Sequence, residues 1–174
     1  MAFTRTQAGV AAGMAGGLAA TVALFLWPSL PPVPAGAEGR LALWLSCSLI
    51  ASVWLLVAVG RLAGHRFFTP ADIDGGGLTE GTAKAKLLQT LIQNTLEQCL
   101  LAIPAYGAWL WLAPAGRGGL VVLCAGSFAL GRLLFFAGYA RGAPFRALGF
   151  TLTFYPTVGL YLFLLPAAVR LAFS

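Results

Sequence analysis

The chain has 174 residues, of which 59% are hydrophobic and only 9% are charged. Soluble domains carry roughly 25% charged residues, and the few charges here cannot cover the surface of a soluble fold of this length. The composition therefore excludes a soluble globular protein and predicts an integral membrane protein. The net charge of +6 includes no run of basic residues, so we expect no nucleic-acid partner.

Five apolar stretches are long enough to cross a hydrocarbon core of ~30 Å as helices. They cover residues 8–27, 41–62, 84–112, 119–140 and 148–172. The prolines at 28–34 and the proline and glycine at 114–116 mark loops between them. Because the apolar runs are continuous rather than alternating, they favour helices over the strands of a barrel. We expect an all-α integral membrane protein.

The first stretch has two interpretations. Its glycines recur at every fourth position, a spacing that lets helices pack closely: Gly9, Gly13 and Gly17. Alternatively, Arg5, the apolar run and the Ala35-Gly36-Ala37 segment resemble a signal peptide with its cleavage site. The apolar run is longer than usual for a signal, so we favour an uncleaved helix. Residues 1–40 then form an N-terminal hydrophobic helix with a proline-rich loop, and residues 41–174 a four-helix membrane domain.

The positions of the basic residues predict the orientation. If the N-terminus is cytoplasmic, seven of them lie at or near the cytoplasmic face: Arg5, Arg61, Arg66, Lys84, Lys86, Arg141 and Arg146. Only Arg40, Arg117 and Arg170 lie at the opposite face. Basic residues are enriched in cytoplasmic loops. We therefore expect a multi-pass protein of an inner membrane with its basic loops in the cytoplasm.

The third stretch carries a polar face within its apolar sequence. Six polar side chains fall within about half of the helix circumference: Gln89, Thr90, Gln93, Asn94, Glu97 and Gln98. Polar groups that face lipid are costly, so this face must look into protein or a wet cavity. Arg132, inside the fourth stretch, is a candidate partner for Glu97. The pair indicates either an ion pair that fixes helix packing or a polar pocket for a charged ligand near the cytoplasmic interface.

Two further features predict no chemistry of their own. The connector at residues 72–81 is glycine-rich but contains no phosphate-binding motif, so we expect a mobile loop, with His65 before it as a solvated side chain. The three cysteines, Cys47, Cys99 and Cys124, lie in apolar stretches without metal-ligand spacing. They favour small buried hydrophobic side chains rather than a metal site or a disulfide framework.

Residues 93–98 and residues 132–146 together resemble two segments of the family of membrane-associated proteins in eicosanoid and glutathione metabolism (MAPEG). Residues 93–98 match the family's second-helix motif R-x-x-x-N-x-x-E at Asn94 and Glu97, and residues 132–146 are similar to its third helix and the following loop. The resemblance covers residues 41–172. It implies a bacterial-type member with a four-helix bundle, to which the N-terminal helix is an addition. It also implies a homotrimer with glutathione bound between neighbouring subunits at the cytoplasmic side.

The resemblance also implies a set of site residues. Arg146 matches the arginine credited with stabilising the glutathione thiolate, and Tyr139 matches a tyrosine near the bound tripeptide. Five further residues match positions that hold the tripeptide: Arg61, Gln93, Asn94, Glu97 and Arg132. Thr90 departs from the family, because the arginine usual at that position would supply another cation for a carboxylate.

The implied activity is that of a membrane-bound glutathione transferase or peroxidase for lipophilic electrophiles or hydroperoxides. A cation ~4 Å from the sulfur contributes about 4 kcal/mol of raw attraction at an effective dielectric constant of about 20. If desolvation offsets half, the thiol pKa falls by roughly one to two units, which favours the nucleophilic thiolate. The alternative is a non-catalytic relative that binds lipid or scaffolds a partner, and Thr90 favours that alternative.

Overall fold

The computed structural model describes residues 4–173, in which five long helices account for most of the chain. In chain order the elements are α1 (Arg5–Phe25), α2 (Gly36–Phe67), the 3-10 turn η1 (Pro70–Asp72), α3 (Ala83–Leu112), α4 (Leu120–Gly138), the 3-10 turn η2 (Tyr139–Arg141) and α5 (Ala143–Ala172). The described residues contain no strand, so the prediction of an all-α protein is confirmed.

Four of these elements are long and apolar enough to cross a membrane: α1, α2, α4 with η2, and α5. They identify an integral, multi-pass membrane protein. α3 was expected to be a fifth span, and at 30 residues it is long enough. It does not reach the same hydropathy because of the polar side chains in its first half.

The helix boundaries agree with the predicted stretches except in two places. α2 extends over 32 residues from Gly36 to Phe67, beyond the expected 41–62 at both ends. α5 begins at Ala143 rather than near 148, because Pro144 is tolerated in the first turn of a helix, where its missing N–H has no partner to lose. The extended start of α5 includes Arg146.

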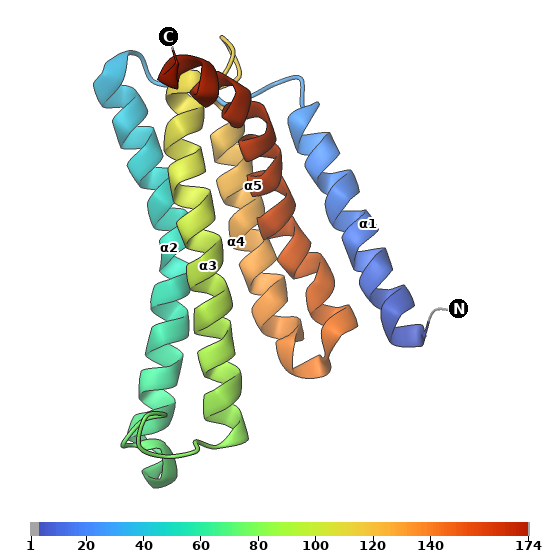
Figure 1. Cartoon of the computed structure of the whole chain (residues 1–174), viewed down its shortest axis with the longest axis vertical. Coiled ribbons are helices and arrows are strands. Elements are labelled where there is room, and N and C mark those ends of the chain that lie inside the picture. The colour runs from blue at the N-terminus through green and yellow to red at the C-terminus, as the bar shows by residue number, and fades with distance from the viewer. Residues whose placement is uncertain (1–3, 174) are drawn as a thin grey trace.

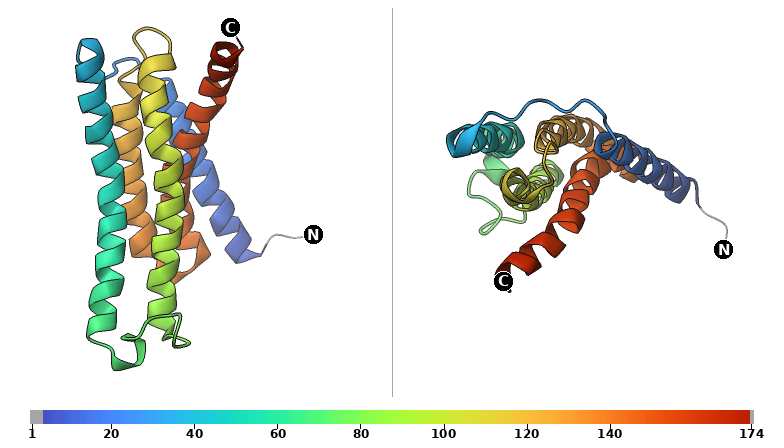
Figure 2. Two further views of the ribbon diagram at one scale, coloured as in Figure 1. Left: turned by 60° about the vertical axis from the view of Figure 1, so that its left-hand side comes forward. Right: turned by 90° about the horizontal axis from the view of Figure 1, so that it is seen from above.

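α2, α3, α4 and α5 run alternately up and down, and α1 lies on the outside against α5 (Figure 1). The two further views in Figure 2 show the same order, with α1 and α2 on opposite sides of the molecule. This course brings the start of α1, the α2–α3 loop and the α4–α5 turn to one end. We call it the basic end, since it carries the seven basic residues expected together on one membrane face.

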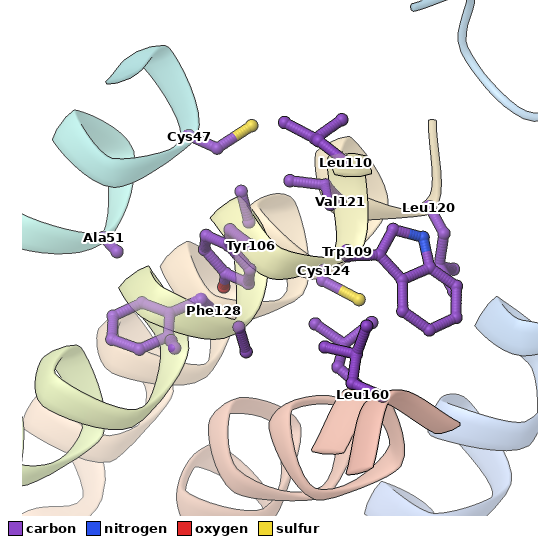
Figure 3. Packing of buried hydrophobic residues seen from close by; sticks show 14 of the residues in the cluster. Cys47, Ala51, Tyr106, Trp109, Leu110, Leu120, Val121, Cys124, Phe128 and Leu160 are labelled. Carbon is purple, nitrogen blue, oxygen red and sulfur yellow. The ribbon is translucent and has the colours of Figure 1, made fainter. Parts of the chain in front are cut away.

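The main core lies between α2, α3, α4 and α5. Figure 3 shows its largest buried side chains, among them Tyr106, Phe128 and Leu160. All three cysteines are buried and free, as expected of small apolar side chains. The core is in the half of the molecule away from the basic end.

α1 packs closely on α5 through its glycines. A Cβ added to Gly9 would lie 2.8 Å from the Cβ of Pro144, and one on Gly13 would lie 2.7 Å from that of Ala147. Gly17 faces Thr151 in the same way. The close approach predicted from the glycine spacing is therefore confirmed, with α5 as the partner helix.

The loop between α2 and α3 is anchored by a buried carboxylate rather than being free over its whole length. Asp72 accepts hydrogen bonds from the backbone N–H of Thr82 (2.7 Å) and its hydroxyl (2.6 Å), and lies 2.9 Å from His65 Nε2. The His65 side chain is only 11% exposed, so the expectation of a solvated histidine is wrong. The sequence spacing did not reveal that the loop folds back onto the end of α2.

The Asp72 anchor predicts a loss of stability in acid. The hydrogen bonds from Thr82 and the contact with His65 hold the pKa of Asp72 below its usual range. Because the pKa of Asp72 is lower in the folded chain than in the unfolded chain (~3.9), its ionised carboxylate stabilises the fold fully at a pH above the unfolded pKa. This stabilisation is lost as the pH falls through the folded pKa. The thermal midpoint in detergent is expected to fall below about pH 4, and less steeply in Asp72→Asn. Asp74→Asn, in the same loop but exposed, is the control; an equal acid sensitivity in wild type and Asp72→Asn would contradict the role of the anchor.

Candidate functional site

A cavity of about 400 Å³ lies between α1, α3, α5 and the junction of α4 with η2. We call it the Arg146 pocket. It brings together three of the predicted site residues, Asn94, Tyr139 and Arg146, which come from three different elements. The remaining lining residues are mostly apolar: Val10, Met14, Thr90, Phe135, Ala143, Ala147, Phe150, Thr151 and Tyr155.

The tight turn between α4 and α5 places Tyr139 beside Arg146. Gly138 lies against the backbone of Phe145 with no room for a Cβ, and Gly142 has a φ of 106°, a conformation that favours glycine. The turn brings the Arg146 Cζ to 4.3 Å from the centroid of the Tyr139 ring. This cation–π contact holds the guanidinium at the pocket wall.

The charge of Arg146 is not neutralised by the protein. Within residues 4–173 the only ion pair is that of His65 with Asp72, in the α2–α3 loop. Arg146 is half-buried and stacks on an uncharged ring. Because a cation in a partly apolar pocket is poorly solvated, it favours an anionic ligand or a thiolate there.

Arg132 supports the pocket from behind. Its side chain is completely buried, and its Nη1 donates to Asn94 Oδ1 (2.8 Å) while its Nη2 donates to Thr153 Oγ1 (2.6 Å). The guanidinium also lies 4.5 Å from the centroid of the Phe135 ring. Since the Asn94 oxygen is held by Arg132, its amide nitrogen remains available to donate into the pocket.

The possible ion pair between Glu97 and Arg132 does not form. Glu97 is exposed on α3 and accepts a hydrogen bond from Gln93 Nε2 (2.8 Å) on the same face. Arg132 is occupied by Asn94 and by Thr153 on α5, which offer neutral oxygens inside the bundle. The polar arc of α3 is therefore divided between an inward part with Asn94 and an outward part with Glu97.

Arg61 lies apart from the Arg146 pocket. It is exposed near the end of α2, with its Cζ 5.7 Å from the centroid of the Phe136 ring. It borders a separate, open hollow of about 490 Å³ that also includes Lys84. Thus Asn94, Tyr139 and Arg146 share one pocket and Arg132 supports it, whereas Arg61, like Gln93 and Glu97, lies on the surface of the single chain.

The pocket also includes side chains of α1 and Tyr155, which the sequence did not predict as site residues. Val10 and Met14 of α1 close one side, and no local signal shows which helix a transmembrane segment will pack against. Tyr155 had a detectable signal, because it follows Thr151 by four residues and so continues the pocket-facing stripe of α5. Its hydroxyl has no hydrogen-bond partner among the described residues.

Comparison with known proteins supports the resemblance found in the sequence. The model of the MAPEG family matches residues 41–166, from the first turns of α2 into the last part of α5. The match includes the residues of α3, α4, η2 and α5 that line the Arg146 pocket, while Val10 and Met14 precede it. No curated protein and no solved structure matches the chain.

Proposed function

We propose that this chain, which belongs to the MAPEG family, is a membrane-bound glutathione-dependent transferase or peroxidase that acts on lipophilic electrophiles or hydroperoxides. The observation that supports this proposal best is Arg146, a cation without an acidic partner, in one pocket with Tyr139 and Asn94. The family is one of membrane proteins of glutathione metabolism, and this pocket has the groups that a thiolate needs.

The chain's residues have distinct roles in this proposal. Arg146 favours the thiolate form of a bound thiol, because its positive charge lowers the free energy of the anion in a partly apolar site. The Tyr139 hydroxyl, which bonds to none of the described residues, donates a hydrogen bond to the sulfur. Asn94, held by Arg132, donates to the peptide part of the ligand. Glutathione supplies the nucleophile, and the apolar walls admit the acceptor.

The charges of one chain match glutathione only in part. Glutathione carries two carboxylates and one ammonium group, whereas the lining of the Arg146 pocket has one cation and no acidic side chain. The complementary charges are exposed on the surface, above all Glu97 and Arg61. An ionised carboxylate inside a membrane-spanning region is costly against lipid, so Glu97 is expected to be covered by another chain or by water.

This incompleteness favours an assembly of several copies. We infer a homotrimer, the arrangement that the family resemblance implies, in which the exposed Gln93, Glu97 and Arg61 complete the glutathione site. The basic end then faces the cytoplasm, in line with the enrichment of basic residues in cytoplasmic loops. In a bacterial inner membrane this orientation gives the site access to cytoplasmic glutathione.

A non-catalytic, lipid-binding role is the second candidate. It is favoured by Thr90, which lines the Arg146 pocket where the family motif has an arginine, and by the predominantly apolar lining. A pocket with a single cation suits a ligand with one anionic group and an apolar body. Co-purified lipid without turnover of any electrophile would support this role.

Saturable binding of glutathione is the expected result that tests the proposal. Purified protein in lipid nanodiscs should bind glutathione at cellular concentrations in calorimetric titration, and Glu97→Gln should weaken binding roughly tenfold by removing a partner of the ammonium group. Glu38→Gln, an exposed acid at the opposite end of the molecule, should bind like wild type. Absence of saturable binding by the wild type rejects the proposed function.

A further inference from the structure

A second cavity, of about 410 Å³, continues from the Arg146 pocket between α1 and α5. We call it the alkyl groove. It shares two lining residues, Met14 and Tyr155, with the Arg146 pocket, so the two cavities adjoin. The other lining residues are small or apolar: Ala15, Leu18, Thr21, Val158, Gly159 and Leu162.

The packing of α1 on α5 bounds this groove along the helices. Along the stretch of α1 that lines the groove, Gly17 lies against Thr151, which lines the Arg146 pocket. On the far side, a Cβ added to Gly159 would lie 2.7 Å from the Phe25 ring, which also stacks on Phe163 at a centroid distance of 5.6 Å. Phe25 therefore packs on Gly159, which lines the part of the groove away from the basic end.

The wall of the groove offers no charge and little polarity. Thr21 donates its hydroxyl to the carbonyl of Gly17 in its own helix (2.8 Å), so this group is already satisfied. The residue with an unpaired polar group among the described lining residues is Tyr155, at the boundary with the Arg146 pocket. These walls suit a ligand with a polar head near Tyr155 and an apolar tail towards Leu162.

We propose that the alkyl groove binds the unbranched alkyl chain of the hydrophobic acceptor, so that α1 selects substrates by chain length. The inference rests on the proposed function, which places the thiolate beside Arg146 at the mouth of the groove. From Met14 to Thr21 the groove follows α1 for about 10 Å at 1.5 Å per residue. The Tyr155 hydroxyl donates to the oxygen of the acceptor, and Leu18 and Leu162 contact the chain from opposite helices.

The selection is tested with unbranched 2-alkenals of increasing length, to which glutathione adds by forming a carbon–sulfur bond at the β-carbon while a proton joins the α-carbon. In wild type, kcat/KM is expected to rise roughly two- to fourfold per methylene until the groove is filled. Leu18→Trp, which fills the groove, should remove this dependence of kcat/KM on chain length. Leu162→Trp fills it from α5 and should behave alike.

Val22→Trp is the matched control, because Val22 lies one turn further along α1, is exposed to a similar extent (48% against 57% for Leu18) and does not line the groove. It should keep the wild-type dependence on chain length. The inference is overturned if both groove variants keep that dependence, or if Val22→Trp loses it as they do.

A binding measurement separates this inference from the proposed function. A long-chain alkyl probe with a terminal diazirine, photolysed with the protein in nanodiscs, should label residues around Leu18 and Leu162, and Leu18→Trp but not Val22→Trp should abolish that labelling. Labelling spread evenly over the lipid-facing surface, or unchanged by Leu18→Trp, overturns the inference even where glutathione binds. Groove labelling without glutathione binding overturns the proposed function and the acceptor role, and assigns the groove to lipid.

Discussion

Replacing Arg146 with alanine is expected to lower glutathione-dependent turnover by roughly 10²- to 10³-fold, the usual cost of removing one group that stabilises a developing or resting anion in a protected site. Arg146 is the only cation that lines its pocket, and no acidic side chain of the described chain pairs with it. Its loss leaves the sulfur without a compensating charge, so the bound thiol stays protonated near neutral pH. The ultraviolet absorbance of the thiolate, measured on the glutathione complex, should disappear with activity.

Three variants distinguish this role from a loss of packing. Arg146→Lys retains the charge and should recover part of the thiolate absorbance, whereas Tyr139→Phe removes the hydroxyl but keeps the ring under the guanidinium. Arg141→Ala removes an exposed arginine of the same turn that lies outside the pocket, and should behave like wild type. Full thiolate absorbance in Arg146→Ala would assign activation of the thiol to another residue.

The sequence predicted the helices well because the bilayer imposes a strong constraint on them. Apolar length and the proline-rich breaks were enough to locate all five, with errors confined to helix ends. α3 shows the limit of that argument, since the polar residues that carry the proposed chemistry also lower its hydropathy. In this helix, the polar residues of the proposed site weaken the hydropathy signal that identifies a membrane span.

The side chains of the site were harder to predict than the helices. A helical wheel placed Asn94 and Glu97 on one polar arc of α3, but it could not tell which of them faces the bundle. The decisive partner of Arg132 is Thr153 on α5, and a threonine in an apolar helix gives no sign that it will accept from a buried guanidinium. Neutral oxygens, rather than the obvious carboxylate, accept from the two Nη atoms of Arg132, and its Nε has no partner among the described residues.

The contribution of α1 to the Arg146 pocket could not be predicted from the sequence, for a related reason. Its glycine spacing predicted close packing but not the partner, which depends on how the loops connect the helices in three dimensions. Only the docking of α1 on α5 shows that Met14 lies at the boundary between two cavities. Residues outside the matched family segment thus line the same pocket as Asn94 and Arg146.

Arg132→Ala is expected to destabilise the protein by about 3–5 kcal/mol, because it opens a large cavity and leaves the side-chain oxygens of Asn94 and Thr153 without the arginine donor. The fall in the free energy of unfolding can be measured by titration with a denaturing detergent. Arg132→Met fills most of the same volume with apolar atoms and should be the more stable of the two variants. It nevertheless releases Asn94, so it should weaken glutathione binding while the fold remains.

A double-mutant cycle with Asn94→Ala tests whether Arg132 acts on the ligand through Asn94. If Arg132 is a positioning residue, Arg132→Met should weaken glutathione binding in the wild-type background and have little further effect once Asn94 is alanine, because contacting residues couple and independent ones add. Leu120→Ala, a substitution in the main core away from the pocket, is the control for general destabilisation and should leave the affinity unchanged. Additive losses of affinity would show that Arg132 contributes through its charge, across the pocket wall, rather than through the orientation of the Asn94 amide.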